Sequence, residues 1–238
     1  MGLSRLQEQM ERVMRKTLLA VAMAGVAFNA LAADSADLTV KGVLVNAACS
    51  PSLDKTEVSF GHIPLSNLDK TNANQLGSKD VTLTITCDNA MVMGWTTVDG
   101  HTDSLETLTL SKAGADDSDV TDAANEYGLG KAGTVNLGSY SITAKTTGVT
   151  YDGTAGDLLE ADNVGHGSTT AWTKSTKGVS KPAVRTFTAA VSGETTPKAY
   201  KVGVFPLKVT AAVQGTDALK ITEDTDLDGL ATISLSYI

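Results

Sequence analysis

Apolar and polar residues alternate along much of the chain after its first 33 residues. In residues 81–87 every second residue is apolar, which turns one face of a strand toward a core and the other toward solvent. No amphipathic helical stretch longer than about two turns interrupts this pattern. The two-residue period predicts strands at residues 38–45, 81–87, 105–110, 134–144, 184–191, 200–213 and 231–238.

Turn-forming residues separate the predicted strands. They include Ser50-Pro51, Asp99-Gly100, residues 151–153, residues 165–167 and Ser192-Gly193. Many short strands with turns between them are typical of an antiparallel β-sandwich. The chain has no repeat and no linker rich in proline or serine. We therefore expect one all-β domain, in which residues 113–181 form long loops or an insertion around two or three strands.

The first 32 residues have the order of a secretory signal peptide. Basic residues that include Arg15 and Lys16 come first, the uncharged run 17–33 follows, and Ala30-Leu31-Ala32 is a small-x-small cleavage signal. A membrane anchor is the alternative, but 17 uncharged residues are fewer than the ~20 that a spanning helix needs. We predict cleavage after residue 32 and export of the mature chain, with residues 1–13 as an upstream extension.

The mature chain keeps both cysteines, Cys49 and Cys87. Two cysteines in an exported protein usually pair, and closing a loop of this length stabilises a fold by ~4 kcal/mol in the chain-entropy model. A metal pair or a redox site is the alternative. Both alternatives have little support, because the sequence has no CxxC spacing and no histidine near either cysteine. We expect a Cys49–Cys87 disulfide.

Composition narrows the classes of function. The chain has 19 basic and 27 acidic residues, a net charge of −8, and no block of basic residues. Such a surface is poorly suited to nucleic acid or to an anionic membrane. Apolar residues make up 42% of the chain and charged residues 19%, which is typical of a globular protein and not of a disordered one.

Residues that could carry catalysis or bind a metal are few and scattered. His62, His101 and His166 have no companions at the spacing of a metal site or a catalytic triad. Residues 224–229 resemble the start of a calcium-binding loop, but the position of the bidentate glutamate is Leu235. Each of the two tryptophans could stack on a sugar or belong to the core. We expect no catalytic residue, no metal and no cofactor.

The two ends of the mature chain carry distinctive motifs. Residues 38–49 alternate apolar and other residues around a central Gly42 and lead into the first cysteine. Cys87 ends an alternating strand, and the chain closes with a strand whose penultimate residue is Tyr237. These motifs resemble those of the pilin subunits of bacterial chaperone–usher fimbriae, and in particular a less-studied fimbrial-like family within that group.

The resemblance implies an immunoglobulin-like sandwich that lacks its last strand, which a periplasmic chaperone and then a neighbouring subunit supply in trans. It divides the chain into a signal peptide at 1–32, an N-terminal extension at 33–47 and a pilin-like domain at 48–238. It implies a donor face of Leu38, Val40, Gly42 and Leu44, and an edge of Ala231, Ile233, Leu235 and Tyr237 that the chaperone and the incoming strand contact.

The resemblance also implies a function. It makes the chain a structural subunit of a fimbrium that polymerises by donor-strand exchange and supports adhesion, with the chaperone, an outer-membrane usher and neighbouring subunits as partners. The protein would pass through the periplasm to the cell surface. A sugar-binding adhesin subunit, or another exported β-sandwich binding protein, is the alternative, and a host glycan or protein receptor stays open. We expect no enzymatic activity and no nucleic-acid partner.

Overall fold

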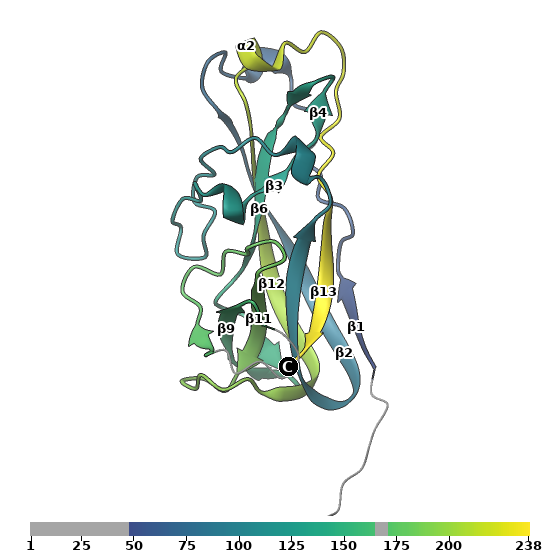
Figure 1. Ribbon diagram of the computed structural model, residues 1–238, viewed down its shortest axis with the longest axis vertical. Coiled ribbons are helices and arrows are strands. Elements are labelled where there is room, and N and C mark those ends of the chain that lie inside the picture. Colours follow the sequence, from purple (N-terminus) through teal and green to yellow (C-terminus); the bar gives the residue numbers. More distant parts are fainter. Residues whose placement is uncertain (1–47, 165–170) are drawn as a thin grey trace, which may run out of the picture. The chain divides into compact units, whose positions relative to one another are not determined.

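Two antiparallel sheets pack against each other. The computed structural model describes residues 48–164 and 171–238 (Figure 1). Its strands are β1 (Cys49–Leu53), β2 (Asn74–Asp99), β3 (Tyr127–Gly128), β4 (Lys131–Ala132), β5 (Val135–Asn136), β6 (Gly138–Ala144), β7 (Thr150–Tyr151), β8 (Thr154–Ala155), β9 (Asp157–Asp162), β10 (Thr173–Lys174), β11 (Arg185–Ala190), β12 (Ala199–Val213) and β13 (Ala231–Tyr237). The expected all-β sandwich is confirmed.

Helical segments in the described ranges are short. They are the 3-10 turns η1 (Leu65–Asn67), η2 (Thr102–Ser104) and η3 (Ala123–Asn125) and the single α-turn α2 (Thr216–Leu219). None of the described helices is long and apolar enough to cross a membrane. The predicted signal peptide and the predicted strand at residues 38–45 lie outside the described residues.

The long strand β2 connects the two sheets. Its first part pairs with β12 from Asn74 to Thr86, the pairing then skips to Met91, and there the strand bends back on itself (Figure 1). The first half of β2 lies in one sheet with β1, β12, β6, β3 and the small β7–β8 hairpin. The second half lies in the other sheet with β13, β11, β9 and β10.

Inward-facing residues of both halves of β2 form the centre of the core. Leu83 and Ile85 come from the first half and Trp95 from the second, and all three are fully buried. The Trp95 ring lies 5.0 Å from that of Phe187 on β11 and 5.8 Å from that of Phe205 on β12. The apolar residues that alternate in the sequence are therefore those that face the core between the two sheets.

Two local predictions were wrong. Residues 105–110 form no strand; their only ladder contacts in the described chain are single bridges from Leu105 to Gly138 and from Leu110 to Val120. The predicted turn at Ser50-Pro51 is the middle of β1, where Pro51 stands opposite Ile85. Proline is tolerated there because β1 lies at the edge of its sheet, where a missing N–H removes no central ladder bond.

The region 113–181 holds more ordered structure than expected. It contains β3 to β10, several of them only two residues long, joined by tight turns. One such turn joins β7 to β8 through Asp152 and Gly153, both with positive φ, which is the backbone twist that favours a two-residue hairpin.

Candidate functional site

A long apolar groove separates β1 from β13. Within the described part of the chain each of these strands pairs only with β2, so each has one free edge. The groove between them has a volume of about 1540 Å³. Residues of β1 such as Leu53 line one side, and residues of β13 such as Ile233 line the other.

The groove continues beyond both strands between two irregular walls. One wall is the extended segment 55–65 and the other is the segment 221–229. From residue 55 to residue 63, no backbone N–H or C=O is hydrogen bonded to another described backbone group. Val58 and Phe60 nevertheless pack against the core, so this wall is held by its side chains and not by a ladder.

The floor of the groove is the core itself. Apolar side chains from β2, β6, β12 and the neighbouring turns line it: Val81, Leu83, Leu129, Leu137, Ile142, Leu207, Val209 and Val213. Tyr140 also lines the groove, and burial raises the pKa of its hydroxyl, so this side chain stays neutral. An uncharged floor of this kind favours an apolar occupant over water.

The residues of β13 that the sequence singled out differ in their burial. Ala231, Ile233 and Leu235 are half-buried and pack against the core cluster, as their shared face requires. Tyr237 is the penultimate residue and is 44% exposed, and neither it nor Leu235 is among the residues that line the groove. The predicted donor residues Leu38, Val40, Gly42 and Leu44 lie outside the described residues.

The disulfide predicted between Cys49 and Cys87 is confirmed. The two cysteines stand opposite each other at the start of β1 and in the first half of β2, with a Cα–Cα distance of 4.1 Å. The bond ties the edge strand β1 to the core, and hydrogen bonds from Asp88 N–H to Ala48 C=O and from Asp54 N–H to Thr82 C=O extend the ladder at both ends. Disulfides of this kind are typical of oxidising compartments outside the cytosol.

Hydrogen bonds to the rest of the fold hold the wall at 221–229. Asp228 donates its backbone N–H to Leu129 C=O at 3.0 Å, and Leu230 C=O accepts from the backbone N–H of Gly100 at 2.8 Å. The Nδ1 atom of His101 lies 2.6 Å from the carbonyl oxygen of Asp228. His101 therefore has a structural contact, and the calcium-like segment belongs to a groove wall.

The upper part of the groove has an acidic rim. Glu57 stands on one wall, and Glu223, Asp224 and Asp226 stand on the other; all four are exposed. Lys55 is the lysine that lines the groove near Glu57, and Lys220 stands three residues before Glu223. This end of the groove therefore disfavours a negatively charged occupant.

Sequence reasoning located only part of this site. The strand β13 was predicted from its alternation, whereas the walls at 55–65 and 221–229 were not, because their few apolar residues follow no strand period. Among the described residues, no group of three or more histidines, cysteines or carboxylates is placed to hold a metal ion. Trp95, one of the two candidates for sugar stacking, is fully buried in the core.

Comparison with known proteins identifies relatives over nearly the whole chain. YhcF of Escherichia coli (strain K12), described as an uncharacterized protein, is 30% identical over 237 residues, which cover 91% of this chain and 97% of YhcF. This chain belongs to the YhcF family. GltF of the same organism is also 30% identical, over 244 residues that cover 92% of this chain and 96% of GltF. A family model described as a protein of unknown function (DUF1120) matches residues 38–141, from Leu38 to the middle of β6.

Proposed function

We propose that this member of the YhcF family is a structural subunit of a chaperone–usher fimbrium, and that its groove receives the N-terminal extension of another subunit. The observation that carries the proposal is the groove, with a free strand edge along each side and the hydrophobic core as its floor. A strand laid into it would gain backbone hydrogen bonds to β13 and would cover apolar side chains.

The extension at residues 33–47 has the pattern that such an occupant needs. In an extended strand Leu38, Val40 and Leu44 lie on one face, and Gly42 occupies a position on the same face. The apolar side chains would enter the groove, and Gly42 would stand where the floor comes closest to the inserted backbone. An exported pilin of this kind would need a periplasmic chaperone to cover the groove, and an usher to exchange the chaperone for the next subunit.

Charge favours one direction of insertion. The acidic rim at residues 57 and 223–226 lies at the end of the groove where β13 begins. The acidic residues of the extension, Asp34 and Asp37, are at its N-terminal end. An extension that runs antiparallel to β13 keeps these residues away from the rim, whereas the parallel direction places like charges together.

The direction of β1 then favours a strand that comes from another copy. Both β1 and β13 are antiparallel to β2, which reverses between them, so β1 and β13 run in opposite directions (Figure 1). An extension antiparallel to β13 is thus parallel to the β1 that follows it in the chain. To insert into its own groove it would have to return along its full length, ~26 Å for residues 38–45. Residues 46–48 span at most ~11 Å.

A peptide experiment tests the proposal. The isolated mature subunit should unfold at a low temperature, and a synthetic peptide of residues 33–47 should raise its melting temperature. A peptide at one hundred times its dissociation constant adds ~2.7 kcal/mol to the free energy of unfolding. The matched control is the same peptide with Gly42→Leu, which should stabilise far less. A melt of the isolated subunit that is cooperative and unaffected by either peptide would contradict the proposal.

A further inference from the structure

A second hollow lies away from the groove, between the loop 118–125 and the sheet of β9 and β11. Its volume is about 270 Å³, and it shares no lining residue with the groove. The loop contributes polar side chains from one side, and Glu160, Lys177 and Arg185 contribute from the other. Its walls are mainly polar, in contrast to those of the groove.

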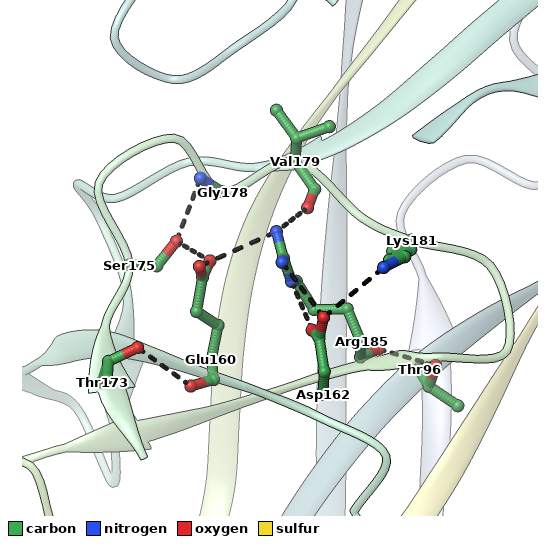
Figure 2. Close-up of polar contacts among 9 residues, drawn as sticks. All are labelled: Thr96, Glu160, Asp162, Thr173, Ser175, Gly178, Val179, Lys181 and Arg185. Carbon is green, nitrogen blue, oxygen red and sulfur yellow. Dashed lines mark hydrogen bonds and ion pairs between the residues drawn. The ribbon is translucent and has the colours of Figure 1, made fainter. Parts of the chain in front are cut away.

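An ion-pair network holds the floor of this hollow (Figure 2). The Nε atom of Arg185 donates to Asp162 Oδ1 at 2.9 Å, and its Nη1 donates to Val179 C=O at 3.1 Å. Glu160 Oε1 lies 3.7 Å from the same Nη1, while Glu160 Oε2 accepts from the hydroxyl of Ser175. The guanidinium of Arg185 is therefore fixed between two carboxylates and already neutralised.

The rim of the hollow, in contrast, carries mostly exposed polar side chains that have few hydrogen-bond partners in the protein. Asp119 and Asp122 each use one carboxylate oxygen to accept a backbone N–H, from Lys112 at 2.8 Å and from Ala124 at 2.9 Å. Their second oxygens have no hydrogen-bond partner in the ranges 48–164 and 171–238. Four other lining residues have side-chain polar groups without a hydrogen-bond partner in these ranges. They are the amide of Asn125, the hydroxyls of Thr121 and Thr176, and the ammonium of Lys177.

The charges around the hollow nearly balance. Three carboxylates, Asp119, Asp122 and Glu160, stand against Lys177 and Arg185. Because Arg185 is already paired and the carboxylates are in excess, an anion has no favourable place here. The unpaired side-chain groups of the rim include both hydrogen-bond acceptors and donors. A ligand with neighbouring hydroxyl groups can bond to both kinds, because a hydroxyl donates and accepts.

We propose that this hollow binds a small, uncharged, hydroxyl-rich molecule of the size of one sugar ring. A volume of about 270 Å³ lies just below the ~300–1,000 Å³ of pockets for drug-sized ligands, so it suits one ring and not an oligomer. The occupant would donate hydroxyls to Asp119 and Asp122 and accept from Asn125 and Lys177. Val120 and Val179 supply its apolar contact. No aromatic side chain lines the hollow in the described chain, so the affinity rests on hydrogen bonds and is weak.

Saturation-transfer NMR on the full mature chain, with its groove filled by the 33–47 peptide or by its chaperone, tests this proposal. The probes are glucose, galactose, mannose and N-acetylglucosamine at millimolar concentration, with N-acetylneuraminic acid as the anionic comparison. At least one neutral sugar should bind. Asn125→Ala should weaken that binding about fivefold, the effect of losing one hydrogen bond, and Lys177→Ala should weaken it similarly.

The matched controls are Asn89→Ala and Lys198→Ala, two exposed residues that line neither the hollow nor the groove. They should leave sugar binding unchanged. Absence of transfer to every neutral sugar, binding that is equally strong in the Asn125 and Lys177 variants, or binding of the anionic sugar alone would each overturn the proposal. None of these outcomes bears on the groove, because the two sites have no residue in common.

Discussion

Two neighbouring tyrosines in the core differ in how their hydroxyl groups are satisfied. The rings of Tyr127 and Tyr140 stack with their centroids 5.0 Å apart. The Tyr127 hydroxyl makes hydrogen bonds to Thr97 Oγ1 at 2.5 Å and to Ser180 Oγ at 2.6 Å. The buried hydroxyl of Tyr140 has no partner among the described residues. The pair therefore offers an internal test of what hydrogen bonds contribute to this fold.

Tyr127→Phe should lower the free energy of unfolding by about 1–3 kcal/mol, because it leaves the buried hydroxyl of Thr97 without a partner. Tyr140→Phe removes an unsatisfied group and should be neutral or stabilising. Denaturant unfolding of the two variants, each saturated with the 33–47 peptide, measures the difference. Equal losses in both variants would show that ring packing alone accounts for the effect.

Glu126 is a second residue whose surroundings predict a measurable effect. Its side chain is buried, Oε2 accepts the backbone N–H of Leu108 at 3.1 Å, and Oε1 has no partner within the described chain. Burial disfavours the ionised form and raises the pKa of the carboxyl above its usual 4.5. Between the usual and the raised pKa the unfolded chain has lost a proton that the native state keeps, so the stability of the fold falls as pH rises through this window.

Glu126→Gln removes this ionisation and keeps an acceptor for Leu108. The variant should unfold at a higher temperature than the wild type at neutral pH, and the difference should shrink as the pH falls below the raised pKa. Melting curves over a pH series test this expectation. The control is Glu194→Gln in an exposed turn, which should give the same curves as the wild type at every pH.

At the scale of elements, alternation in the sequence located the strands whose two faces differ. The prediction for residues 200–213 matches β12 within one residue, and that for 231–238 matches β13. The prediction for 81–87 found only part of β2, since its ends lack the alternation. The strand β9 was missed because Asp157–Asp162 places charged residues on both sides of a short apolar run. The ends of β2 and the strand β9 form because they pair with neighbouring strands. A local sequence pattern does not contain this pairing.

Burial along β13 predicts that different residues of this strand contribute to stability and to partner binding. Leu235 packs against the core cluster, whereas Tyr237 is 44% exposed at the end of the strand. Leu235→Ser should therefore lower the melting temperature of the peptide-bound subunit. Tyr237→Ser should leave that melting temperature nearly unchanged and weaken the capture of the subunit by its chaperone.

Periplasmic co-expression followed by affinity purification of the chaperone measures that capture. Ser236→Ala, on the opposite face of the same strand and outside the lining of the groove, is the control and should be captured like the wild type. If Tyr237→Ser unfolded the domain as severely as Leu235→Ser, Tyr237 would belong to the core and not to a partner-binding edge.

At the scale of the whole molecule, the proposed insertion of the extension into the groove would make assembly sensitive to single residues of the extension. Gly42→Leu adds bulk on the face expected to meet the groove floor, where overpacking costs ~1–3 kcal/mol. It should block fibre formation without changing the secretion or the disulfide of the subunit. Val43→Leu changes a residue on the opposite face by one methylene and should assemble normally. Electron microscopy of cells that express each variant distinguishes them, and equal fibre counts would show that Gly42 is not the position of close contact.

How much of the site was predictable also depends on this scale. The strand that borders the groove and the cysteine pair carry local signals, so Tyr237 and Cys49 could be found from the sequence. The floor could not, because Leu129, Leu137 and Val213 come together only when three separate segments pack. The small hollow was likewise invisible, since loop 118–125 meets β9 and β11 only in the folded chain.

If subunits assemble by donor-strand exchange, the opposite directions of β1 and β13 would make the two ends of the fibre different. An inserted extension would enter beside Tyr237 and leave where β13 begins, and its own domain would stand beyond that end. The receiving copy could not return the exchange to the same partner, because β1, which follows its own extension in the chain, starts at the other end. A contact of this kind is heterologous and does not close into a dimer. Copies would add in a line whose last member still presents its groove of about 1540 Å³, and a fibre of this kind would need a different protein to cap that end.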